Sequence, residues 1–289
     1  MIDAKLLTLI TLVEEKKYIK TADKLFISQP AVTQHIKALE KEYDIVIFSN
    51  KKTLELTKSG AMLLEYAKSI KEQEELLVNT IKNQALDTIN VGITPFAFKP
   101  VFKRINKDNK LQGKLEVNLY VDSYDILKNK LSSGNLDFII CDNSFDSSKY
   151  DSVLLFSERI ILAANQTGKY KDTTRLTREL LQQANIVMPS DDTGMYQVIK
   201  ETLKYKNIKL KNNILVKANS LESVLGLTKL YDGVSYIYES SLDEDYKRLD
   251  LTNFNPSQNF YLLYNRFSDQ SEKTINFIKV LKEIGTLEW

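Results

Sequence analysis

One short stretch, residues 28–39, most constrains what this chain can fold into. It reads Ser-Gln-Pro-Ala-Val-Thr-Gln-His-Ile-Lys-Ala-Leu. Ser28 is a favourable helix N-cap, and Pro30 falls in the first turn, where its missing N–H is harmless. Apolar residues then recur at helical spacing, at Val32, Ile36, Leu39 and Tyr43. The stretch therefore predicts a short helix with one buried stripe.

The opposite face of this helix carries hydrogen-bonding groups and no acid before Glu40. The members of this outward row are Gln29, Thr33, Gln34 and Lys37. Residues 20–25 predict a preceding helix, and residues 26–28 a turn. Two helices joined by so short a turn form a helix-turn-helix, whose second helix enters the DNA major groove. Ordinary helix packing uses the same spacing, so spacing alone leaves assembly open as an alternative.

The longer run from Ala22 to Glu40 places Ser-Gln-Pro-Ala-Val ahead of an Ile-x-x-Leu-Glu ending. It resembles the N-terminal signature of LysR-type transcriptional regulators, and the similarity continues through Phe48 and residues 56–60. The resemblance implies a winged helix-turn-helix, a linker helix that pairs two subunits, and a two-lobed α/β effector domain similar to periplasmic solute-binding proteins. The fold class is then α/β overall with an all-α winged head.

The outward row and the resemblance together predict the DNA contacts. An amide side chain can pair bidentately with adenine, so Gln29 and Gln34 are predicted to read base edges. Ala31 and Thr33 are predicted to touch thymine methyl groups, on a surface that includes Pro30. The predicted contacts to the DNA backbone are Thr21, Lys37, Lys51 and Lys52. The two last lysines fall on the turn of an expected two-stranded wing, which lacks the glycine that the family commonly has there.

The predicted domains are a head over residues 1–58, a linker helix over 59–86 and an effector domain over 87–289. Leu63, Ile70 and Leu77 repeat every seven residues, beside Ala67 and Ile81, and predict a seam that pairs subunits. After the linker, strands and helices alternate in the order β-α-β-α-β, which indicates a mostly parallel sheet. Lobe I is expected over about 87–162 and 264–289, and lobe II over about 163–263.

Composition indicates the cellular compartment of the protein and excludes some classes of function. The net charge is only +2, so attraction to DNA must be local to the head. A single cysteine, Cys141, permits no intrachain disulfide and is expected to be a small buried side chain. The N-terminus shows no secretory signal, and no apolar run is long enough to span a bilayer. We therefore expect a cytoplasmic protein without a membrane partner.

The sequence gives no support for a catalytic motif. The single histidine, His35, lies in the predicted recognition helix, so no Ser-His-Asp or Cys-His arrangement can form in the effector domain. The sequence has no spaced Cys/His cluster and no glycine-rich phosphate loop. We therefore expect neither an enzyme nor a cofactor nor a metal.

A ligand site is predicted where strands end and helices begin, because free N–H groups meet there. The predicted effector-binding residues are Thr94, Phe96, Ser123, Ser190, Thr193 and Ser220. Each hydroxyl residue also suits a helix N-cap that serves only its own helix, and Phe96 also suits the core. The resemblance favours a joint role in binding a small effector, which we expect to be anionic or zwitterionic.

The sequence thus predicts a sequence-specific transcriptional regulator controlled by a small molecule bound between two lobes. Its expected partners are double-stranded operator DNA, the effector and a second copy of itself, as a homodimer or homotetramer, with RNA polymerase as a further candidate. The alternative is a cytosolic small-molecule binding protein whose N-terminal helices serve assembly. Strong salt dependence of DNA affinity distinguishes the two.

Overall fold

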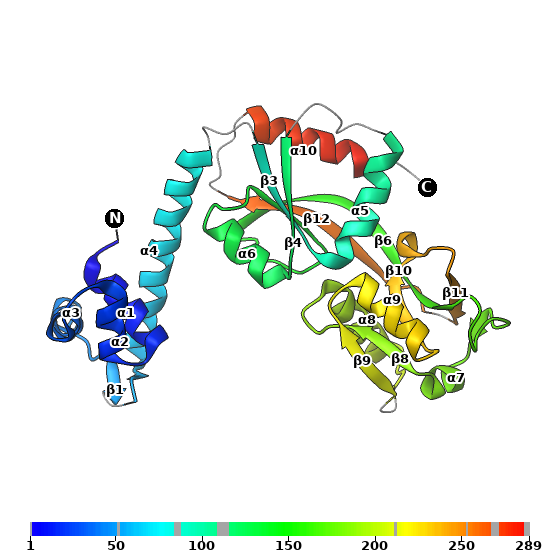
Figure 1. The fold of residues 1–289 in the computed structure, drawn as a ribbon, viewed down its shortest axis with the longest axis horizontal. Coiled ribbons are helices and arrows are strands. Elements are labelled where there is room, and N and C mark those ends of the chain that lie inside the picture. Colours follow the sequence, from blue (N-terminus) through cyan, green and yellow to red (C-terminus); the bar gives the residue numbers. More distant parts are fainter. Residues whose placement is uncertain are drawn as a thin grey trace. The chain divides into compact units, whose positions relative to one another are not determined.

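The computed structural model describes residues 2–50, 53–83, 88–108, 116–210, 213–252, 254–266 and 272–285. The chain separates into two compact units, residues 1–82 with 132–134 and the remaining residues. The first is mainly helical and carries a small two-stranded sheet, and the second is built around a large mixed sheet (Figure 1). The predicted class, an all-α winged head followed by an α/β domain, is confirmed.

The head contains a three-helix core, a wing and the linker helix. Its elements are α1 (Ala4–Glu15), α2 (Tyr18–Leu25), α3 (Gln29–Glu42), β1 (Phe48–Asn50), β2 (Glu55–Leu56) and α4 (Lys58–Asn83). The predicted caps are present: the Ala31 N–H donates to Ser28 Oγ at 3.3 Å, and the Gly60 N–H donates to Thr57 Oγ1 at 2.9 Å. Strands β1 and β2 pair antiparallel as the wing.

The apolar stripe of α3 packs into the core of the head. Val32, Ile36 and Leu39 are buried together with the inner face of α1. The turn from α2 to α3 is closed by the Ile27 N–H, which donates to the Ala22 carbonyl at 3.0 Å. Burying one stripe fixes the rotation of α3 about its axis, so the polar row must face outward.

The predicted apolar seam of α4 divides into a buried part and an exposed part. Leu63 and Ala67 are buried against the core of the head, whereas Leu77 and Ile81 are each 60% exposed. At about 1.5 Å per residue, a helix of this length extends beyond a three-helix core. The expectation of one continuous pairing seam is therefore wrong for its first two turns, which stabilise the head itself.

The second unit has two lobes that share strands. Lobe I holds β3 (Thr88–Ile93), α5 (Pro95–Asp108), β4 (Glu116–Val121), α6 (Tyr124–Ser132), β5 (Phe138–Cys141), β12 (Ser257–Asn265) and α10 (Glu272–Gly285). Lobe II holds β7 (Arg175–Leu176), α7 (Arg178–Gln183), β8 (Ile186–Pro189), α8 (Gly194–Tyr205), β9 (Ile214–Ala218), α9 (Leu221–Leu230), β10 (Val234–Tyr238), the 3-10 helix η1 (Glu239–Ser241) and β11 (Tyr246–Leu251). The strand order is β4-β3-β5-β12-β6-β10-β8-β9, with β11 beside β6 and β7.

Strand β6 (Tyr150–Asn165) runs from one lobe into the other. Its residues up to Arg159 pair with β12, and those from Ile160 onward pair with β10 and β11. Strand β12 also pairs with β5 in the sheet of lobe I, through Tyr261, Leu262 and Leu263.

Candidate DNA-binding and effector sites

Helix α3 presents the predicted polar row to solvent. Gln29, Pro30, Gln34 and Lys37 are exposed, and Ala31 and Thr33 are half-buried. The Thr33 hydroxyl donates to the Gln29 carbonyl at 3.3 Å. An exposed row of amide, hydroxyl and ammonium groups on the second helix of a helix-turn-helix is suited to a DNA groove.

Three predicted backbone contacts need separate treatment. Thr21 is fully buried, and its hydroxyl donates to the Lys17 carbonyl at 2.9 Å. It therefore stabilises α2 and is not available to a phosphate, which corrects the prediction. Lys51 and Lys52 lie outside the described residues, and the wing strands on either side of them are formed as expected.

His35 has a positioning role that the sequence did not indicate. The Thr8 hydroxyl donates to the Ala4 carbonyl at 2.8 Å, so its oxygen is left to accept a proton from another donor. His35 Nδ1 lies 2.8 Å from that oxygen, at hydrogen-bonding distance. The imidazole thus ties α3 to α1, beside the row of groups that face outward.

A pocket lies between the two lobes of the second unit. Its lining residues are Thr94, Pro95, Phe96, Ser123, Tyr124, Asp142, Asn143, Asp192, Thr193 and Asn219. Four of the six predicted effector residues, from both lobes, are therefore brought together. The pocket encloses about 30 Å³, which is room for about two water molecules. The lobes are closed on each other.

The other two predicted residues do not line this pocket. Ser220 caps α9: its Oγ accepts from the Ser223 N–H at 3.2 Å, and its neighbour Asn219 takes the place in the lining. The Ser190 hydroxyl donates to Asp192 Oδ1 at 2.6 Å. Both hydroxyls serve local turns, which is the alternative that the sequence left open.

Asp142 is the central group of the pocket, and the sequence analysis did not identify it. It lies at the end of β5 and is 1% exposed. Its Oδ2 accepts from the Tyr238 hydroxyl at 2.5 Å and the Met195 N–H at 3.0 Å, and its Oδ1 accepts from the Thr94 hydroxyl at 3.4 Å. Because Tyr238 and Met195 belong to lobe II, one carboxylate of lobe I holds both lobes together.

A negative charge on Asp142 is energetically unfavourable at this buried position. Burial raises the pKa of this carboxyl above its ordinary value of 3.8, although the hydrogen bonds from Tyr238, Met195 and Thr94 oppose that shift. The Met195 N–H that bonds to it belongs to the first turn of α8, and a helix N-terminus favours a negative charge. Asp142 thus occupies, within the protein, the position that an anionic ligand would need.

Glycine at the start of α8 permits this contact. A β-carbon on Gly194 would overlap the Asp142 carbonyl oxygen, so only glycine allows α8 to approach the end of β5. The same carbonyl accepts a hydrogen bond from the Gln258 side-chain amide. Beside it, Asn143 Nδ2 donates to the Asp192 carbonyl at 2.8 Å. The closed cleft is therefore held by backbone groups as well as by the carboxylate.

A buried ion pair lies where β6 crosses between the lobes. Arg104 Nη2 is 2.7 Å from Glu158 Oε2, and both side chains are almost fully buried. Glu158 Oε1 also accepts from the Ser240 N–H at 3.0 Å, and the guanidinium lies 3.8 Å from the centre of the Phe156 ring. These contacts fix α5 of lobe I to the crossover strand.

Other expected features can be placed within the described part of the chain. Cys141 is a fully buried free thiol, as predicted, and burial raises its pKa. No group of three or more His, Cys, Asp or Glu side chains among the described residues could hold a metal ion. None of the described helices is both long and apolar enough to cross a membrane.

Comparisons with known proteins agree with this architecture. The lysR family of bacterial regulatory helix-turn-helix proteins matches residues 4–61, and the LysR substrate binding domain matches residues 82–285. An uncharacterised HTH-type transcriptional regulator in the lacR 5′ region of Staphylococcus xylosus is 22% identical over 95% of this chain and 99% of its own. The HTH-type transcriptional regulator YtlI of Bacillus subtilis (strain 168) is 30% identical over 46% of this chain and 45% of its own.

Among solved structures, full-length CbnR in complex with its target DNA superposes with a TM-score of 0.59. The alignment covers 97% of this chain and 98% of that one at 17% identity, so it supports the fold. The two family matches show that the chain belongs to the LysR family of DNA-binding transcriptional regulators.

Proposed function

We propose that this regulator reads an operator with the outward row of α3. Gln29 and Gln34 hydrogen-bond to base edges, Ala31 and Thr33 contact thymine methyl groups beside Pro30, and Lys37 contacts the DNA backbone, as Lys51 and Lys52 would from the wing. The observation that carries this proposal is the exposure of the row on the second helix of a helix-turn-helix. The alternative of assembly helices is disfavoured by the family.

The effector is proposed to bind between the lobes, in the pocket around Asp142. The ten residues that line this pocket include two carboxylates, Asp142 and Asp192, and no Lys, Arg or His. An anion would be repelled by both carboxylates. The N-terminus of α8 could not attract it, because that N-terminus already donates to Asp142. The expectation of an anionic or zwitterionic effector is therefore narrowed to a small molecule with an amino or other cationic group, which retains the zwitterions and leaves out simple anions.

Self-association is supported by two exposed apolar surfaces, one in each unit. On α4, Met62, Tyr66, Leu77 and Ile81 are all more than half exposed. In lobe I, edge strand β4 has all six side chains exposed, including Val117, Leu119, Tyr120 and Val121. Unpaired edges and apolar patches of this kind are normally covered. We propose a homodimer or homotetramer in the cytoplasm, acting on DNA and on RNA polymerase.

Control would follow from the closed state of the cleft. Asp142 bonds to lobe II directly, so a ligand that competes for or adds to those bonds changes the balance between closed and open lobes. The ligand can shift that balance only as far as its affinities for the two states differ. A change in lobe arrangement would then alter how the paired heads are spaced on DNA.

Selection of fragmented genomic DNA on the purified full-length protein tests the function. At near-physiological salt with excess competitor DNA, a few intergenic fragments should be enriched, and their affinity should fall steeply as salt rises. The genes beside those fragments would narrow the effector. Enrichment of no fragment, with pooled metabolites present and absent, would favour the small-molecule binding protein instead.

A further inference from the structure

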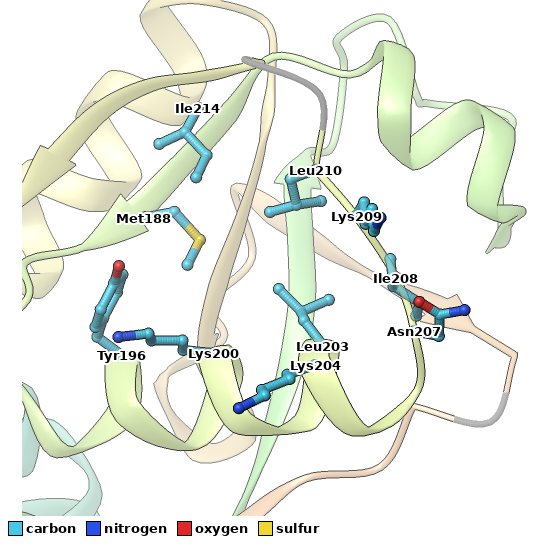
Figure 2. Close-up of a pocket in the computed structure, with 10 residues that line it drawn as sticks. All are labelled: Met188, Tyr196, Lys200, Leu203, Lys204, Asn207, Ile208, Lys209, Leu210 and Ile214. Carbon is cyan, nitrogen blue, oxygen red and sulfur yellow. The ribbon is translucent and has the colours of Figure 1, made fainter.

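Lobe II contains a second pocket that shares no lining residue with the cleft. It lies between α8, strands β8 and β9 and residues 207–210, and Figure 2 shows its side chains around an open centre. Its lining residues are Met188, Tyr196, Lys200, Leu203, Lys204, Asn207, Ile208, Lys209, Leu210 and Ile214. We call it the lysine pocket. At about 360 Å³ it is within the size range of small-molecule sites.

The far wall of the lysine pocket is fixed by the way α8 ends. Asn207 adopts a left-handed conformation (φ 51°), and its N–H donates to the Lys204 carbonyl at 3.0 Å. The Ile208 N–H donates to the Leu203 carbonyl at 2.8 Å, which completes a Schellman motif. Gln182 Nε2 then donates to the Lys209 carbonyl at 2.9 Å, so the wall is anchored to α7. The pocket is therefore a property of the fold.

Its floor is apolar and its rim is cationic. Met188, Leu203 and Ile208 are buried in the lobe II core, and Ile214 on edge strand β9 is partly exposed. The exposed lysines Lys200, Lys204 and Lys209 stand around this floor. No Asp or Glu is present among the ten residues described as lining it.

The three lysines reach the rim from two sides. Lys200 and Lys204 are four residues apart on one face of α8, and Lys209 follows the helix end on the opposite wall. Lys217 outside the pocket instead pairs with Asp191 at 2.6 Å and lies over the Tyr196 ring. All three lysines line one common space.

We propose that the lysine pocket is a second ligand site, which takes a small amphiphilic anion: a monocarboxylate with an alkyl or aryl body. The body would displace water from the floor formed by Met188, Leu203 and Ile214, and the carboxylate would lie among the ammonium groups. The cleft has the opposite charge, so the two sites select different ligands. Both contact α8, whose first turn donates to Asp142 and whose last turn forms the lysine pocket.

Calorimetric titration of the full-length protein tests the proposal, with octanoate as the probe and octylammonium as its match of opposite charge. Octanoate should bind saturably at one site per chain and about tenfold more tightly than octylammonium, because only the anion is complementary to the rim. Lys204→Glu should weaken octanoate binding about tenfold. Lys229→Glu is the matched control, because Lys229 lies in the last turn of α9 and does not line the pocket.

A second variant, Ile214→Trp, leaves all three lysines in place and fills the space from an exposed strand position. It should abolish octanoate binding while the thermal unfolding temperature remains unchanged. The proposal is overturned by the absence of saturable octanoate binding, by equal binding of octylammonium, or by full octanoate affinity in both Lys204→Glu and Ile214→Trp. None of these results depends on knowing the operator or the cleft ligand.

Discussion

Helix α3 of the head and the cleft of the second unit differ in whether packing and recognition use the same residues. On α3, Val32 is fully buried while Gln34 is exposed, so packing and recognition occupy different faces of one helix. In the cleft, Asp142 lines the pocket and also bonds to both lobes. The difference teaches that substitutions should separate DNA recognition from stability in the head, and should change both together in the cleft.

The largest effect is expected from the glycine that lets the lobes approach. In Gly194→Ala, the new methyl group would overlap the Asp142 carbonyl oxygen, which cannot move without breaking the cleft contacts. We expect a loss of about 3 kcal/mol in the free energy of unfolding, together with loss of effector response. Urea unfolding of the full-length chain measures the first, and operator binding with and without effector the second.

Gly226 provides the matched control for that substitution. It lies inside α9 with no atom near the position of a β-carbon, so Gly226→Ala adds the same methyl group without a clash. Alanine is the better helix former, and we expect a gain of about 0.5–1 kcal/mol. Equal losses in both variants would contradict the view that the close approach at Asp142 holds the lobes.

An intermediate effect is expected from a pair of substitutions on α3. Gln34→Ala should reduce discrimination at one base position by about 1–3 kcal/mol and change the unfolding free energy by less than about 0.5 kcal/mol. Val32→Ala should instead lower the unfolding free energy by about 2 kcal/mol with base preference unchanged. Operator libraries and urea unfolding measure the two quantities. Unaltered base preference in Gln34→Ala would remove this glutamine from the proposed contacts.

This contrast also explains which parts of the site could be read from the sequence. The α3 surface follows from a cap at Ser28 and a helical period, so its outward residues are fixed by local rules. Asp142 follows an apolar strand, and nothing in the neighbouring sequence distinguishes it from any other residue that follows such a strand. Its importance arises from Tyr238 and Met195, which are distant in sequence, and no local pattern predicts that they meet.

The fold shows the same division. The order of helices and strands was predictable, because burial imposes a helical period on α3 and α8 and a continuous apolar run on β3. Strand β11 was missed because charged side chains, such as Lys247 and Arg248, interrupt its pattern. The early part of the α4 seam was assigned to a partner because the sequence does not show that Leu63 and Ala67 pack against their own head. Tertiary contacts decide such positions.

The smallest effect is a trend with pH, and it tests whether Asp142 carries a charge at a cost to stability. Burial raises the pKa of this carboxyl above 3.8, so between that value and the raised pKa the folded state holds a proton that the unfolded state has lost. Stability from this group is therefore greatest at low pH and declines as pH rises. Asp142→Asn removes this titrating group. The melting temperature of the variant should therefore rise relative to that of the natural protein as pH increases from about 4.

Asp146, four residues further on, gives a control of opposite sign. Hydrogen bonds from Ser148 lower the pKa of its exposed carboxyl, so the stability that this group adds rises between the lowered pKa and 3.8 and is constant at higher pH. The melting temperature of Asp146→Asn should therefore fall relative to that of the natural protein as pH rises toward about 4, and the difference should stay constant above that pH, where Asp142→Asn gains. If the two variants drift in the same direction, burial does not dominate at Asp142. If they diverge as expected, the cleft retains a charge that weakens the fold, as a group that recognises a cationic ligand would.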